Sequence, residues 1–90
     1  MTSRRFRPSP RFIRQVTSAD EGIKKRIFPA LRRLCENPHG KGVHLEPIQG
    51  QPGFYSARVT DGMRLLLMER QDEHGRYFEI VRFGSHDQTY

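Results

Sequence analysis

Two arginines beside a predicted hairpin turn are the residues of this chain best suited to chemistry on an anion. The segment Thr60-Asp61-Gly62 separates two β-type runs, and a three-residue loop at that point places Arg58 directly opposite Arg64 on one face of a sheet. Like charges in directly opposed positions repel each other, whereas an anion between them is attracted to both. The residues leave two interpretations open: a bound anion, or a separate carboxylate such as Glu69 or Glu79 for each arginine.

The C-terminal segment Gly84–Tyr90 offers a group for proton transfer. His86 follows closely after a glycine at a predicted strand end, and an imidazole exchanges protons near neutral pH. Asp87 need not contact it, because adjacent side chains of an extended chain point in opposite directions. An exposed histidine most often has no catalytic role. This segment therefore indicates a catalytic site only together with the two arginines.

The remaining titratable residues show no pattern for metal or disulfide chemistry. The single cysteine, Cys35, cannot form an internal disulfide, and we interpret it as a filler of an apolar helix face rather than a nucleophile. His39, His44 and His74 fall in or beside predicted loops without metal-ligand spacing, and they are interpreted as surface residues. We therefore expect neither a metal nor another cofactor.

The charge of the chain favours a polyanionic partner. The 90 residues include 16 Lys and Arg against 10 Asp and Glu, for a formal net charge of +6. The excess lies in the first 33 residues, where only Asp20 and Glu21 oppose it; the basic residues there are Arg4, Arg5, Arg7, Arg11, Arg14, Lys24, Lys25, Arg26, Arg32 and Arg33. The alternative is that most of them lie on solvated helix faces.

Two helices are predicted in the first half of the chain. Residues 3–8 form either an edge strand or a loose arm, and Ser9-Pro10 then starts a helix with Phe12, Ile13 and Val16 on one face. A second helix starts from a capping box of Ser18 and Glu21 and ends by Asn37. Its apolar stripe comprises Ile23, Ile27, Ala30, Leu31, Leu34 and Cys35. Pro29 lies within the stripe and predicts a kink.

Three strands are predicted after a connecting segment at 43–48, namely 54–59, 63–70 and 76–83, and their short joints favour antiparallel hairpins. In the first hairpin Val59 pairs with Met63, and Gly62 takes a left-handed conformation. The face opposite the arginines is apolar and carries Tyr55, Ala57, Val59, Met63, Leu65 and Leu67. The sequence thus predicts one α+β domain over residues 1–90, with two N-terminal helices packed on one face of a small antiparallel sheet and the other face free for function.

No segment has the length and apolarity of a membrane span, and the basic start lacks the apolar stretch of a signal peptide. We therefore expect a cytoplasmic protein.

Three segments together resemble the RelE/ParE superfamily of bacterial toxin–antitoxin toxins, and the resemblance spans nearly the whole chain. They are His44-Leu45-Glu46-Pro47-Ile48-Gln49-Gly50, the run from Phe54 through Tyr55-Ser56-Ala57-Arg58-Val59 to Gly62-Met63-Arg64-Leu65, and the tail Gly84-Ser85-His86-Asp87-Gln88-Thr89-Tyr90. The resemblance implies the RelE-like fold, in which the antiparallel sheet is curved. It also implies a metal-independent endoribonuclease that inhibits translation by cutting mRNA on the ribosome.

The family's functional positions fall on particular residues of this chain. The resemblance gives catalytic roles to Arg58 on the strand, to Arg64 after the hairpin glycine, and to His86 with Tyr90 near the end. Some RelE-like enzymes carry lysines where this chain has Ser56 and Arg58. Because arginine stays protonated, we favour His86 as the base or acid, with Tyr90 stacking on a nucleobase or assisting proton transfer. Predicted RNA contacts are Arg4, Arg5, Arg7, Ser56 and Arg82.

The resemblance also predicts the partners, which are a cognate antitoxin, mRNA and the ribosome, with operator DNA contacted through the antitoxin. Two alternatives stay open. A ParE-like protein of the same fold poisons DNA gyrase without RNA chemistry, and a non-catalytic member only binds its partner. The His86–Tyr90 tail favours the nuclease, and the absent lysines favour the non-catalytic protein.

Overall fold

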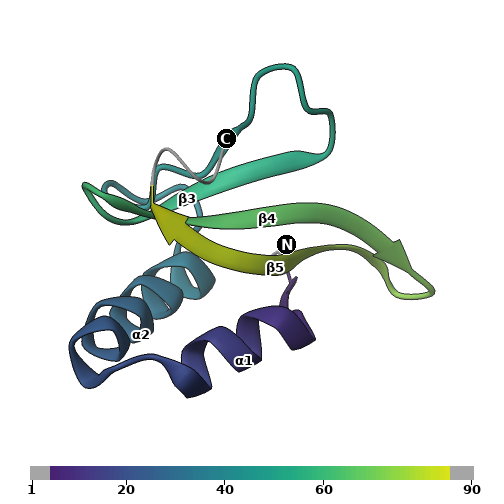
Figure 1. Cartoon of the computed structure of the whole chain (residues 1–90). Coiled ribbons are helices and arrows are strands. Elements are labelled where there is room, and N and C mark those ends of the chain that lie inside the picture. The colour runs from purple at the N-terminus through teal and green to yellow at the C-terminus, as the bar shows by residue number, and fades with distance from the viewer. Residues whose placement is uncertain (1–4, 86–90) are drawn as a thin grey trace.

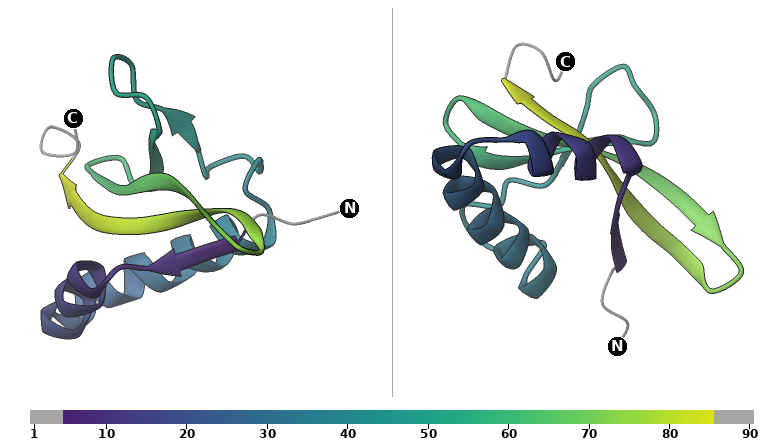
Figure 2. Two further views of the ribbon diagram at one scale, coloured as in Figure 1. Left: turned by 90° about the vertical axis from the view of Figure 1, so that its right-hand side faces the viewer. Right: turned by 60° about the horizontal axis from the view of Figure 1, so that its bottom comes forward.

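The computed structural model describes residues 5–85, which form two helices and one five-stranded sheet (Figure 1). In chain order the elements are β1 (Arg5–Pro8), α1 (Pro10–Ser18), α2 (Glu21–Glu36), β2 (Glu46–Pro47), β3 (Phe54–Thr60), β4 (Met63–Asp72) and β5 (Gly75–Ser85). The order in the sheet is β1-β5-β4-β3-β2. Two further views show both helices on the same side of this curved sheet (Figure 2).

The sheet is mixed, which corrects the predicted antiparallel sheet. The pairs β2–β3, β3–β4 and β4–β5 are antiparallel, but β1 runs parallel to β5, with Phe6 opposite Phe78. Short turns fix the direction of the hairpin strands, whereas β1 pairs with residues 72 positions away in the chain and no turn constrains it. Of the two alternatives for the N-terminal segment, the edge strand is confirmed.

Helix α1 begins where the sequence predicts it. Ser9 Oγ accepts a hydrogen bond from the Phe12 amide at 3.0 Å and donates to the Val81 carbonyl at 2.7 Å. The cap therefore also attaches the helix to β5. Phe12 is buried, but Ile13, which was expected beside it, is 50% exposed. Phe12, Ile13 and Val16 line the same hollow, which confirms that they share one face, and Ile13 lies on the exposed side of it.

Helix α2 has a different cap from the predicted one. Asp20 Oδ1 accepts a hydrogen bond from the Ile23 amide at 2.8 Å, while Ser18 is the last residue of α1. The chain turns so tightly between the helices that Ser18 is still helical, which excludes the predicted capping box. The helix ends at Glu36, as predicted, and Asn37 is its cap. It continues through Pro29 without a break, and the bend there stays a prediction.

The hairpin register confirms the central prediction but corrects its turn. Arg58 pairs with Arg64, whereas Thr60, not Val59, pairs with Met63. The ladder is irregular between Arg58 and Thr60, so Val59 forms a bulge and Thr60, which was assigned to the loop, is the last paired residue of β3. The connection therefore needs only Asp61 and the glycine after it. Positive φ angles among the described glycines occur at Gly42, Gly50, Gly53 and Gly75, so the left-handed Gly62 was a wrong prediction.

The core lies between the helices and the predicted apolar face of the sheet. Ala57, Val59, Leu65 and Leu67 are buried there, and Tyr55 and Met63 pack against the same cluster, as predicted. The helices contribute Phe12, Ile27, Ala30 and Leu34. Cys35 is exposed, which corrects its place in the core stripe. Partial burial and the neighbouring Glu36 carboxylate raise the pKa of its thiol, so little nucleophilic thiolate forms.

One side chain of α1 substitutes for a missing strand. Beyond the end of β1, the edge of β5 meets Gln15, whose Oε1 accepts from the Phe83 amide at 2.9 Å and whose Nε2 donates to the Phe83 carbonyl at 3.0 Å. The carboxamide thus satisfies both backbone groups of one edge residue. It holds the C-terminal end of β5 against α1.

We expect Gln15→Leu to destabilise the fold by about 1–3 kcal/mol, because it leaves both Phe83 backbone groups without their partner in a part-buried position. Urea unfolding measures this loss, and hydrogen exchange at the Phe83 amide should accelerate. Gln71→Leu at an exposed position of β4 is the control. Unchanged exchange at Phe83 in Gln15→Leu would contradict the role of the carboxamide.

None of the helices in residues 5–85 combines the length and apolarity that crossing a membrane requires.

Candidate anion-binding site

Arg58 and Arg64 lie side by side on the sheet face that points away from the helices. They are direct partners across β3 and β4. Their strand neighbours Ala57, Val59 and Leu65 are buried in the core, and successive side chains of a strand point to opposite faces. Directly opposed residues have Cβ atoms about 4.5–5.5 Å apart. The structure therefore brings two positive charges together on the outer face.

The surroundings of Arg58 fix its backbone and partly neutralise its charge. Its amide donates to the Val43 carbonyl at 2.7 Å, so β3 is held on both sides at this position. Its side chain is 36% exposed, and Nη2 forms an ion pair with Asp61 Oδ1 in the turn. A carboxylate partner thus exists, but it is not one of those considered from the sequence. Glu79 instead pairs with Arg70 at 2.9 Å.

Arg64 is held by backbone oxygens of the same hairpin. Its Nη1 donates to the Thr60 carbonyl and, at 3.3 Å, to the Met63 carbonyl. A guanidinium carries five N–H donors in a planar fork that suits carboxylate and phosphate oxygens. Arg64 can therefore keep these backbone contacts and still donate to an anion above the sheet.

Arg82 joins the arginine pair on the outer face. The register places Gly84 opposite Arg64, and Arg82 opposite Leu66 on the next outward-facing position of β4. Ser56 pairs with Leu66 from the other side, on β3. Ser56 is only 3% exposed, so its hydroxyl is covered in this structure, and its RNA contact stays a prediction.

Arg7 lies away from this group, on the edge strand β1. Its Nη2 forms an ion pair with Asp72 Oδ2 at 3.0 Å, and its guanidinium carbon lies 4.7 Å from the centre of the Tyr77 ring. Strand β5 separates β1 from the strands that carry the arginine pair. A phosphate at Arg7 would thus bind at a separate point of the surface, and that contact also stays a prediction.

Several predicted site residues fall outside the described residues. Arg4, His86 and Tyr90 lie beyond residues 5–85, and of Arg5 only the backbone, the start of β1, is described. The described part of β5 ends at Ser85, which pairs with Met63 next to Arg64. The contacts of His86 and Tyr90 with the arginines therefore stay predictions.

Sequence reasoning missed the hairpin turn as part of the site. Asp61 pairs with Arg58, three residues before it, and the Thr60 carbonyl accepts from Arg64. A signal was available, because an aspartate in the turn lies within reach of a side chain at the strand end. The alternation along the strands points only to strand carboxylates such as Glu69 and Glu79, and Asp61 lies outside that pattern.

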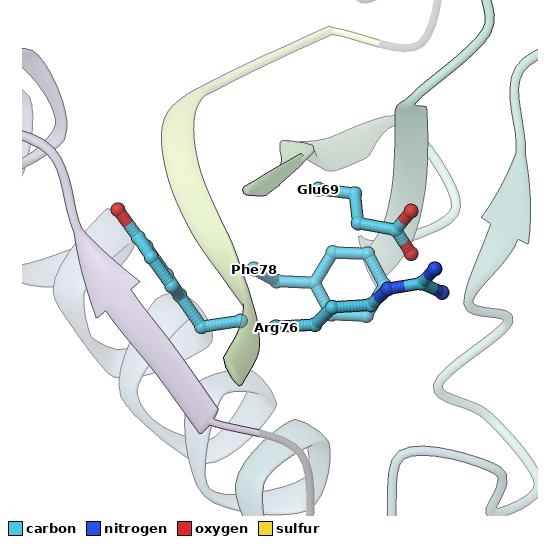
Figure 3. A pocket seen from close by; sticks show the side chains of 4 residues that line it. Glu69, Arg76 and Phe78 are labelled. Atoms are coloured by element: carbon cyan, nitrogen blue, oxygen red, sulfur yellow. The ribbon is translucent and has the colours of Figure 1, made fainter. Parts of the chain in front are cut away.

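A cavity of about 130 Å³ lies away from the arginine pair, towards the β4–β5 turn, and is lined by Glu69, Arg76, Tyr77 and Phe78. Figure 3 shows the Glu69 and Arg76 side chains extending on the same side as the Phe78 ring. Phe78 itself belongs to the core. None of the residues that line this cavity pairs with Arg58 or Arg64 in the sheet, so we do not include the cavity in the arginine site.

Metal binding finds no support in the described residues. Within residues 5–85, no three or more His, Cys, Asp or Glu side chains lie together in a way that could hold a metal ion. His39, His44 and His74 are exposed, as predicted for surface residues.

Comparison with solved structures identifies the fold. The chain is similar to the YoeB/ParE toxin from Agrobacterium tumefaciens, with a TM-score of 0.65 and 16% identity over 91% of this chain and 98% of that chain. It is also similar to a chain of the DinJ-YafQ toxin-antitoxin complex from E. coli, with a TM-score of 0.68 and 18% identity over 99% of both chains. A chain of the archaeal RelE-RelB complex from Pyrococcus horikoshii OT3 gives a TM-score of 0.65 and 14% identity over 93% of this chain and 96% of that chain.

No protein-family model matches the sequence, and no curated protein matches it either. The solved structures cover nearly the whole chain, so the predicted RelE-like fold is confirmed.

Proposed function

We propose that this chain, which has the fold of RelE-like toxins, is the toxin of a type II toxin–antitoxin pair and a metal-independent endoribonuclease that cleaves mRNA on the ribosome. The observation that carries the proposal is the arginine pair, Arg58 opposite Arg64, on the outer face of that fold. Arg82 on the same face adds a third positive charge. The net charge of +6 supports a polyanionic substrate.

The chemistry is attack of an RNA 2′-oxygen on the adjacent phosphorus, which forms a 2′,3′-cyclic phosphate and breaks the bond to the 5′-oxygen. The 2′-hydroxyl loses a proton, the phosphorane gains negative charge, and the leaving 5′-oxygen takes up a proton. Arg58 and Arg64 stabilise the negative charge of the phosphorane. A well-placed donor lowers the activation barrier of such a step by about 3–4 kcal/mol. Neither can act as base, because guanidinium stays protonated. We assign proton transfer to His86, with Tyr90 assisting it or stacking on a base.

The proposed partners follow the same fold comparison. Two of the similar structures are complexes with an antitoxin, which supports a cognate antitoxin for this chain. We propose mRNA and the ribosome as targets, operator DNA as a contact made through the antitoxin, and the cytoplasm as the location.

Primer extension on mRNA after induced expression tests the nuclease. We expect discrete cleavage stops with the wild type and at least a hundredfold less cleavage with His86→Ala, at unchanged RNA affinity, because the variant loses general acid–base catalysis. Growth arrest without cleavage stops would contradict the nuclease. A gyrase supercoiling assay on the same samples then identifies a gyrase inhibitor, and antitoxin binding without either effect identifies the non-catalytic protein.

RNA affinity should fall steeply with salt if arginines contact phosphates. For single-stranded RNA, we expect a log–log slope of about 0.7 per phosphate contact. Filter binding between low and physiological ionic strength measures the slope. The joint replacement of Arg4, Arg5 and Arg7 by glutamine should reduce the slope, because these residues are proposed RNA contacts, and an unchanged slope would contradict those contacts. A flat dependence for the wild type would remove the electrostatic part of the proposal.

A further inference from the structure

The hairpin turn holds both arginines of the site. Asp61 accepts from Arg58, and the carbonyl of the residue before it accepts from Arg64. Two like charges directly opposite each other repel, and Asp61 supplies a negative charge at that point. Asp61 is itself 93% exposed, so its carboxylate is not held by burial.

We propose that the Asp61 carboxylate is the resident anion of the arginine pair, which an RNA phosphate must displace from Arg58. The inference rests on the proposed function and adds a competing group to the same site. An anion bound there before the substrate arrives lowers the affinity for RNA.

The strength of the ion pair suits a group that is displaced. Arg58 and Asp61 form an exposed ion pair between residues three apart in the chain. Breaking such a pair changes an equilibrium constant, here that of RNA binding, by a factor of about two to five. A phosphodiester offers two oxygens to a guanidinium fork, and charge-assisted bonds of that kind are stronger than neutral ones. Phosphate can therefore replace the carboxylate at small cost, and Arg64, bonded to backbone carbonyls, does not have to move.

The test is a comparison of Asp61→Asn with the wild type in binding a single-stranded RNA whose 2′-hydroxyls are methylated. This probe binds but cannot be cleaved, because the nucleophile is blocked. We expect Asp61→Asn to bind about two- to fivefold more tightly at low salt, with the gain lost near 1 M salt, where the Debye length is about 3 Å. Asp61→Glu, which keeps the charge, should bind like the wild type.

Glu73→Gln is the matched control, because it changes the net charge equally at an exposed glutamate beyond the opposite end of β4. It should give a smaller gain than Asp61→Asn. The gain from Asp61→Asn should also disappear in an Arg58→Ala background, because the competition requires that guanidinium. Equal gains from Asp61→Asn and Glu73→Gln would show a general charge effect and overturn the inference.

Weaker binding by Asp61→Asn would also overturn it, because the carboxylate would then position Arg58 for RNA rather than compete with RNA. RNA binding by the two arginine variants distinguishes a wrong role for Asp61 from a wrong proposed function. If Arg58→Ala and Arg64→Ala both bind the methylated RNA like the wild type, the arginine pair is not the RNA site at all.

Discussion

Replacement of Arg64 by alanine is expected to abolish toxicity and to reduce mRNA cleavage by about a hundredfold to a thousandfold, with little change in Tm. The rate effect follows from the loss of a donor aimed at the phosphorane, and such losses cost about 3–4 kcal/mol of transition-state stabilisation. The small effect on stability follows from its place on the outer face, away from the core cluster. Growth after induced expression, primer extension and thermal unfolding measure the three quantities.

Two control variants make this result specific. Arg70→Ala removes the same charge from the same strand, but Arg70 pairs with Glu79 beyond the arginine pair, so cleavage should persist. Arg64→Lys keeps the charge and loses the planar fork, so it should recover only part of the activity. Cleavage by Arg64→Ala at the wild-type rate would contradict the assignment of this arginine, even with the fold unchanged.

The largest effect on stability is expected at Phe78. Its side chain is 1% exposed, stacks on Phe6 with ring centres 5.7 Å apart, and meets Tyr55 edge-on at 4.9 Å. Phe78→Ala removes these contacts and leaves a cavity, which typically costs about 3–5 kcal/mol. In a domain of this size we expect the Tm to fall by roughly 15–30 °C, or the protein not to fold. Differential scanning calorimetry measures the change.

Phe28→Ala is the matched control for that prediction. Phe28 is the same residue type on α2 but is 53% exposed, and alanine is favourable in a helix. We expect its free energy of unfolding to change by no more than about 0.5 kcal/mol. Similar losses for the two variants would mean that Phe78 does not belong to the core cluster as described.

The local elements and the arginine pair could be predicted because their causes lie within a few residues. The Ser9-Pro10 start of α1 and the end of α2 before Asn37 depend on capping contacts three or four residues apart. The period-2 alternation of β3 and β4 decides which side chains reach the core. A register shift of one residue would bury an arginine. The pairing of Arg58 with Arg64 was therefore predicted correctly, although the length of the turn between them was not.

The predicted cap of α2 and the predicted hairpin turn were wrong by one or two residues, because neighbouring residues suit the same position almost equally well. Asp20 and Ser18 both carry a suitable capping oxygen, and only the tight connection between the helices selects Asp20. Likewise, Thr60 fits either a loop or the end of a strand, and its pairing with Met63, made possible by a bulge at Val59, places it in the strand. Asp61 was read as a turn residue, and its role as partner of Arg58 emerged only from the side-chain geometry.

The sequence by itself thus determined the two helices, the strands β3, β4 and β5, the two faces of β3 and β4, and the pairing of the two arginines. The tertiary structure decided the parallel placement of β1, the burial of Ser56 and the attachment of α1 to β5. Ser9 and Gln15 bond to partners 72 and 68 residues away. No periodicity or turn signal reaches across such separations, because these contacts form only when the whole chain packs around one core.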